Sequence, residues 1–135
     1  MNIIADTNVL LRAIVRDDPA QAIVADVALR NATQIVLTLQ TLCEFVWVLT
    51  SRYRRPRPDI AATIRQLMLI PNVVADRRAV AAGLAIMDAG GDFADGIINH
   101  EGLRQSGDLF VTFDVIAAGI LTAAGNDVTL LTVAT

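Results

Sequence analysis

The sequence contains no lysine, and this absence removes several kinds of active site. All eleven basic residues are arginine. A phosphate-binding P-loop needs a lysine within a GxxxxGK[ST] run, and the chain has no such run. Phosphotransfer sites of the receiver and haloacid types normally rely on a lysine too, and the haloacid type needs an aspartate where Asn8 stands. The common lysine-dependent phosphate chemistries are therefore excluded.

Cysteine and long apolar runs are also scarce. Cys43 is the only cysteine, so no internal disulfide forms and no cysteine-based zinc site is expected. The longest uncharged stretches, 31–43 and 115–126, are shorter than the ~20 apolar residues of a membrane helix. The N-terminus has no basic segment before an apolar one, so no signal peptide is expected. These features predict a cytoplasmic protein without a membrane segment.

Size and composition predict one globular domain over residues 1–135, since 54% of the residues are hydrophobic and only 19% are charged. The net charge of -3 and a pI near 4.9 argue against nucleic-acid binding when taken alone. However, four carboxylates neutralised by bound metal would change the sum to -3 + 4 = +1. The net charge therefore does not decide whether the partner is a nucleic acid.

Short apolar segments alternate with segments of helical character along the whole chain. The expected strands are residues 1–5, 34–38, 72–75, 109–112 and 128–132. The expected helices are residues 8–16, 20–30, 41–52, 59–69, 77–89, 93–105 and 115–124. This alternation predicts an α/β fold with a parallel sheet covered by helices on both faces.

Four acids fall near strand ends or at the helix starts that follow them: Asp6, Glu44, Asp95 and Asp114. Ligands of open parallel sheets bind beyond the carboxyl ends of the strands, so these acids are candidates for one site. Thr112 lies two residues before Asp114 and would face the same way on an extended strand.

Each acid also has a purely local interpretation. Thr41 and Glu44 fit a capping box, and Asp92 with Asp95 resembles the same device. Asp6 and Asp114 would favour the helix N-termini that follow them. For any one acid taken alone, the capping role is the more common one.

The joint pattern favours a metal site. Glu44 lies in the apolar run TLCEFVWVL, where we expect Phe45 and Trp47 in the core. A buried carboxylate needs a partner, and no lysine is present to provide one. A divalent cation shared by several carboxylates would meet that need, and such oxygen-rich sites suit Mg²⁺ or Mn²⁺.

The acidic motifs resemble those of the PIN-domain family. In length, the chain is similar to the family's VapC-type toxins of toxin–antitoxin pairs. DTNVLLR at residues 6–12 resembles the family's opening, while GGDFADGII and FVTFD resemble its later acidic motifs. The resemblance implies a three-layer sandwich around a five-stranded parallel sheet of order 3-2-1-4-5. It also implies a likeness to metal-dependent endoribonucleases that are homodimers held inactive by a small antitoxin.

The resemblance further implies the role of each site residue. Asp6, Glu44, Asp95 and Asp114 would form the acidic centre and hold one or two Mg²⁺ or Mn²⁺ ions. Supporting roles fall to Thr112, through a metal-bound water, and to Asn8, which would orient the first acid; Asp92 matches the motif less directly than Asp95. The chain departs from the family after Asp114, where a basic residue and an aromatic one are usual and VIAAGILTAAG stands instead.

The substrate implied by this resemblance is single-stranded RNA, such as a tRNA or rRNA loop. The candidate phosphate ligands are Arg12 and Arg16 near Asp6, and the basic cluster of Arg52, Arg54, Arg55 and Arg57. The cluster could instead be a solvated loop or a contact to an acidic segment of the antitoxin. Two other functions stay open: a PIN-fold protein that acts with its antitoxin on DNA without catalysis, and a housekeeping nuclease without an antitoxin.

Overall fold

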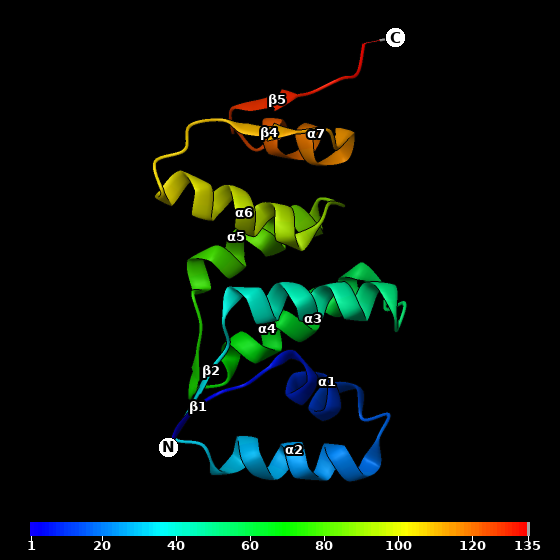
Figure 1. Cartoon of the computed structure of the whole chain (residues 1–135), viewed down its shortest axis with the longest axis vertical. Helices are drawn as coiled ribbons and strands as arrows, with labels where there is room; N and C mark the ends of the chain where they lie inside the picture. The colour runs from blue at the N-terminus through cyan, green and yellow to red at the C-terminus, as the bar shows by residue number, and fades with distance from the viewer. Residues whose placement is uncertain (135) are drawn as a thin grey trace. The chain divides into compact units, whose positions relative to one another are not determined.

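The computed structural model describes residues 1–134, which form two compact units. The first unit is Met1–Asp76, and the second begins at Arg77. Figure 1 shows the elements of both units.

The first unit is a small α/β arrangement. Its strands are β1 (Asn2–Ile4), β2 (Gln34–Val36) and β3 (Val73–Val74), and its helices are α1 (Thr7–Val15), α2 (Pro19–Asn31), α3 (Leu39–Ser51) and α4 (Arg57–Leu69). The strands form a parallel sheet of order β1-β2-β3, so β2 lies in the middle. In the register, Ile35 of β2 is the partner of Ile3 on one side and of Val73 on the other. Helix α1 packs beside α2 and also contacts α3 (Figure 1).

Local sequence signals explain where the first helices begin and end. Asp18 accepts a hydrogen bond from the backbone N–H of Gln21, and Pro19 occupies the first position of α2, where its missing N–H costs nothing. Arg16 ends α1 in the left-handed conformation with a φ of 59°. The short link between these residues turns the chain so that α2 can pack against α1.

Apolar side chains form the core of the first unit. Leu42, Phe45 and Ile64 are fully buried, whereas Trp47 is 69% exposed. The expectation that Trp47 lies in the core was therefore wrong; α3 buries one face and leaves the Trp47 face to solvent.

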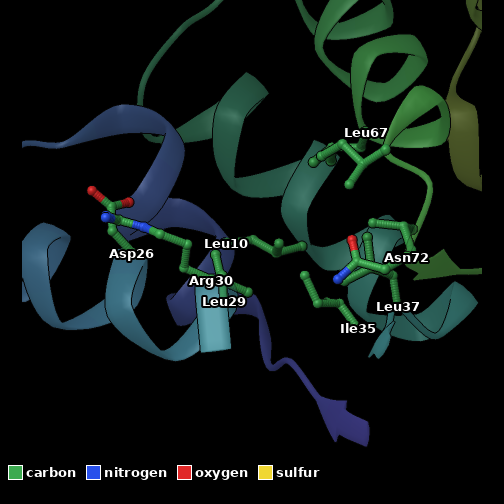
Figure 2. Close-up of a pocket in the computed structure, with 10 residues that line it drawn as sticks. Leu10, Asp26, Leu29, Arg30, Ile35, Leu37, Leu67 and Asn72 are labelled. Atoms are coloured by element: carbon green, nitrogen blue, oxygen red, sulfur yellow. The ribbon is translucent and has the colours of Figure 1, made fainter. Parts of the chain in front are cut away.

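A cavity of about 520 Å³ opens between α1, α2, β2, β3 and α4 (Figure 2). Its walls are mainly aliphatic, and Figure 2 shows Asp26 and Arg30 at one end and Asn72 at the other. None of the acids at the strand ends lines it, so this cavity is separate from the candidate site.

The second unit pairs two long helices with a two-stranded sheet. Its elements are α5 (Arg77–Asp88), α6 (Phe93–Arg104), β4 (Phe110–Thr112), α7 (Val115–Ala123) and β5 (Val128–Leu130). Strands β4 and β5 are parallel, with α7 as the connection that packs on them. Gly90, with a φ of 99°, follows α5 and lets the chain turn toward α6.

Two glycines allow α5 and α6 to pack closely. A Cβ atom on Gly96 of α6 would lie 2.5 Å from the carbonyl oxygen of Ala82 and 2.8 Å from Cα of Gly83. A Cβ atom on Gly83 would lie 2.8 Å from the ring of Phe93, which is fully buried. The helix that carries Asp95 is therefore fixed against α5 by backbone contact.

The structure confirms the expected α/β class and the parallel pairing within each sheet. Each expected helix and strand is present, with ends that move by only a few residues. The pairings of β1 with β2, β2 with β3 and β4 with β5 belong to the expected order, but a single five-stranded sheet is not shown. Among residues 1–134, no helix is long and apolar enough to cross a membrane.

Candidate metal centre

Asp6 follows β1 directly and is the N-cap of α1. Its Oδ1 accepts hydrogen bonds from the backbone N–H groups of Asn8, at 2.8 Å, and Val9, at 3.2 Å. Oδ2 accepts none from residues 1–134, and the side chain is exposed. The cap thus fixes the carboxylate by one oxygen and leaves the other without a hydrogen-bond donor among the described residues. The resemblance implied that Asn8 orients Asp6. In the structure, the backbone N–H of Asn8 donates to Asp6.

Glu44 does not belong to a capping box. The N-cap of α3 is Thr38, whose hydroxyl oxygen accepts from the backbone N–H of Thr41 at 3.2 Å. Glu44 lies further along the helix, where its Oε2 accepts a hydrogen bond from the Thr7 hydroxyl at 2.7 Å. The expectation of a buried Glu44 was also wrong, because the side chain is exposed on the helix face opposite the core. Its partner is a hydroxyl of α1.

A polar cavity of about 260 Å³ contains both of these acids. Its lining consists almost entirely of side chains that carry oxygen: Asp6, Thr7, Asn8, Thr38, Gln40, Thr41 and Glu44. Carboxylate, hydroxyl and amide oxygens are the donors that hard divalent cations prefer. The first unit therefore holds two carboxylates at one edge of its sheet, in a setting suited to such an ion.

Asp114 repeats the arrangement of Asp6 in the second unit. It follows β4 and is the N-cap of α7, with Oδ1 accepting from the backbone N–H groups of Ile116, at 2.9 Å, and Ala117, at 3.0 Å. The hydroxyl oxygen of Thr112 accepts from the backbone N–H of Asp114 at 2.9 Å. Thr112 thereby fixes the backbone that carries Asp114.

Asp92 and Asp95 lie at the start of α6. Asp92 is the N-cap, as the sequence predicted, and accepts from the backbone N–H of Ala94 at 3.2 Å. Partial burial raises the pKa of Asp95, and the negative charges of Asp92 and Asp114 raise it further. Asp92 and Asp114 are thus near enough to Asp95 to disfavour its ionised form, and a cation bound at Asp95 would have the opposite effect.

The chemistry of these residues fits a divalent cation, although the acids fall into two sets. Asp6 and Glu44 belong to the first unit, and Asp92, Asp95 and Asp114 belong to the second. Over residues 1–134, no group of three or more histidine, cysteine, aspartate or glutamate side chains is placed to hold a metal ion. The assignment of Asp6, Glu44, Asp95 and Asp114 as ligands of one centre stays a prediction.

The candidate RNA-binding arginines differ in their surroundings. Arg12 donates to Asp17 at 3.2 Å, and Arg16 pairs with Asp26 at 2.9 Å, so each already has a carboxylate partner. The basic cluster from the end of α3 to the first residue of α4, which holds Arg52, Arg54, Arg55 and Arg57, is exposed. Within this loop Arg54 has a φ of 51°. Binding of RNA by any of these arginines stays a prediction.

The sequence did not indicate several residues that position Glu44 and Arg12. Thr7 holds Glu44, while Tyr53 and Asp17 hold Arg12 together with Gln21. Thr7 is adjacent to Asp6, which was a usable signal. Tyr53 is the only tyrosine and stands within the basic cluster, but nothing local shows that it reaches back to α1.

An α/β chain that places capped carboxylates beyond the ends of parallel strands has polar groups where proteins of this class bind their ligands. Comparison with family models identifies the family: the PIN domain model matches residues 3–118. The chain belongs to the PIN-domain family, whose members are generally nucleases that need metal ions. The comparisons with curated proteins and with solved structures gave no match.

Proposed function

We propose that this chain is a Mg²⁺- or Mn²⁺-dependent endoribonuclease and the toxin of a toxin–antitoxin pair. Membership of the PIN-domain family supports nuclease chemistry with a metal ion. The observation that carries the proposal is that Asp6 and Asp114 have the same arrangement. Each follows a parallel strand, and each uses only Oδ1 to cap the next helix. Both therefore keep one carboxylate oxygen available for a cation.

The proposal includes an arrangement of the whole chain. The five strands would form one parallel sheet of order 3-2-1-4-5, in which Asp6, Glu44, Asp95 and Asp114 act together. The pairings within each unit support this order. We further propose a cytoplasmic homodimer that a small antitoxin inhibits.

The chain's own residues would hold the acids ready for the reaction. The helix N-termini fix Asp6 and Asp114, and the Thr7 hydroxyl fixes Glu44. Partial burial and the neighbouring charges of Asp92 and Asp114 raise the pKa of Asp95, and a nearby cation would favour its ionised form. When bound, the cation would activate a water molecule for attack on a phosphodiester and stabilise the leaving oxygen. The products would carry a 5′-phosphate and a 3′-hydroxyl.

The proposed substrate is single-stranded RNA, such as a loop of tRNA or rRNA. The exposed basic cluster of Arg52, Arg54, Arg55 and Arg57 supports this part of the proposal, because arginine binds phosphate with two parallel hydrogen bonds. Their contribution would show as a strong dependence of binding on salt concentration.

The decisive experiment distinguishes the helix-capping role of Asp6 from its proposed role as a metal ligand. Serine is as good an N-cap as aspartate, so Asp6→Ser should keep the melting temperature within about 2 °C of wild type. It removes the carboxylate, so cleavage of single-stranded RNA in Mn²⁺ should fall more than about a hundredfold. Asp18→Ser at the N-cap of α2 is the matched control and should retain activity. Wild-type cleavage by Asp6→Ser would overturn the proposed site.

The toxin role needs a separate test. Expression of the chain should arrest growth, Asp95→Asn should not, and coexpression of an antitoxin from an adjacent small reading frame should restore growth. Sequencing of RNA ends after induction would identify the cleaved RNA. RNA cleavage without growth arrest would instead indicate a housekeeping nuclease.

A further inference from the structure

A second cavity adjoins the candidate centre, between α1 and α2. This α1–α2 groove has a volume of about 440 Å³ and shares Asp6 and Asn8 with the polar cavity. Small aliphatic side chains, Val24 among them, form most of its walls, and Arg12 and Gln21 supply the remaining polar groups. A ligand bound in the groove would therefore lie next to Asp6, beside the proposed cleavage site.

Arg12 is held rigidly at this groove. Its Nε donates to Oε1 of Gln21 at 2.6 Å, and its Nη1 donates to Asp17 at 3.2 Å and to the Tyr53 hydroxyl at 3.5 Å. Tyr53 also donates to the second oxygen of Asp17 at 2.8 Å. The charge of Arg12 is thus already paired and its plane is fixed. These properties make it a weak ligand for a further phosphate but a good flat surface for stacking.

The groove suits a flat, uncharged group with polar edges. Asp6 and Asp17 would repel a phosphate placed there. An extended peptide would find little backbone to pair with, because α1 and α2 use their N–H and C=O groups within the helices. A nucleobase fits both the apolar walls and the guanidinium plane, since unpaired RNA bases stack on arginine. Gln21 also lines the groove, and because its Oε1 accepts from Arg12, its amide nitrogen is the group that would donate to a base edge.

We propose that the α1–α2 groove binds one unpaired base of the RNA, close to the cleaved phosphate, by stacking on Arg12. This inference rests on the proposed ribonuclease function and adds a base-binding subsite to it. The base would anchor the strand beside Asp6 and give the enzyme a preference at one position of its substrate.

The test compares two neighbouring residues of α2. Val24 lines the groove and is 70% exposed, so Val24→Phe should fill the groove without disturbing the core. Ile23 is 61% exposed but does not line the groove, so Ile23→Phe is the matched control. Ala28→Leu, also in the groove wall, provides a second variant. Circular dichroism would confirm that all three variants fold.

The substrates are one cleavable single-stranded RNA and copies of it with a single abasic nucleotide at each position around the cleavage site. For wild type and Ile23→Phe, loss of the base at one position should lower kcat/KM about tenfold, as expected for a lost stacking contact. For Val24→Phe, cleavage of the intact RNA should fall by a similar factor, and the abasic change should then have little further effect.

Each other outcome overturns a defined part of the argument. If Val24→Phe and Ala28→Leu keep the wild-type dependence on that base, the groove proposal fails while the ribonuclease function stands. If Val24→Phe instead weakens only inhibition by a protein partner, the groove is a protein-docking surface. If the wild-type chain cleaves no RNA, the proposed function fails and the subsite with it.

Discussion

Alanine at Gly96 would add one methyl group where α5 and α6 touch through their backbones. The new Cβ would lie 2.5 Å from the carbonyl oxygen of Ala82, 2.8 Å from Cα of Gly83 and 2.9 Å from the carbonyl carbon of Ala82. These are main-chain atoms, so no side-chain rotation can relieve the contact. The helices must move apart, and the shift would carry Asp95, the residue before Gly96, away from its present position.

The size of the effect follows from two opposing contributions. Overpacking of this kind costs about 3 kcal/mol when the clash is with backbone. Replacing glycine by alanine within a helix returns about 1 kcal/mol. The net loss of about 2 kcal/mol corresponds to a melting temperature lower by roughly 6–10 °C for a chain of this size.

Gly102 in the same helix is the matched control, because a Cβ there would have no atom within 4 Å apart from its chain neighbours and the adjacent backbone of α6. Gly102→Ala should therefore keep only the gain, up to about 1 kcal/mol, and raise the melting temperature. Thermal and urea unfolding followed by circular dichroism would measure both variants. If Gly96→Ala proved as stable as Gly102→Ala, the close packing of α5 on α6 would be refuted.

Three further changes test the electrostatic and hydrogen-bond contacts. Asp95→Asn should raise the melting temperature at pH 7, because folding raises the pKa of Asp95 and so disfavours its ionised form; the gain should vanish below about pH 3, where the carboxyl is protonated in both states. An unchanged or lower melting temperature at pH 7 would contradict this. Tyr53→Phe should lower the melting temperature at pH 7, because the hydrogen bond from Tyr53 lowers the pKa of Asp17 and stabilises the folded state when Asp17 is ionised. This stability should be lost as the pH falls through the lowered pKa of Asp17. A stability loss that is independent of pH would assign the effect to packing. Thr7→Val should lower metal-dependent cleavage roughly threefold to tenfold by freeing Glu44, and Thr7→Ser should restore it; equal activity in both variants would show that the hydroxyl contact has no role.

The order of helices and strands was accessible from the sequence because it depends on local signals. Apolar runs bounded by turn residues marked the strands, and Asp18 with Pro19 marked the start of α2. The caps formed by Asp6, Asp92 and Asp114 were also readable, since an acid before a helical segment has a nearby backbone N–H to accept from.

Contacts between elements were not accessible in the same way. Thr41 and Glu44 have the spacing of a capping box, yet Thr38 provides a cap three residues earlier and leaves Glu44 free to bond with Thr7 of α1. The pairing of Tyr53 with Asp17 likewise depends on how the end of α3 meets the end of α1. Gly83 and Gly96 stand within helices, where glycine is unfavourable, but their facing positions emerge only when α5 packs on α6.

The sequence posed capping and metal binding as alternatives for the acids at the strand ends, and the geometry makes them compatible. A helix N-terminus offers N–H donors to one carboxylate oxygen, as Asp6 and Asp114 both demonstrate. The same bonds fix the second oxygen in direction, which lowers the entropy that a ligand must lose on binding. A parallel strand followed at once by a helix therefore produces a preorganised ligand, provided that the cap is a carboxylate. Serine in the same position would cap the helix equally well, but its neutral hydroxyl would be a much weaker ligand for a cation than a carboxylate. This difference is a physical reason for aspartate at this point of the chain.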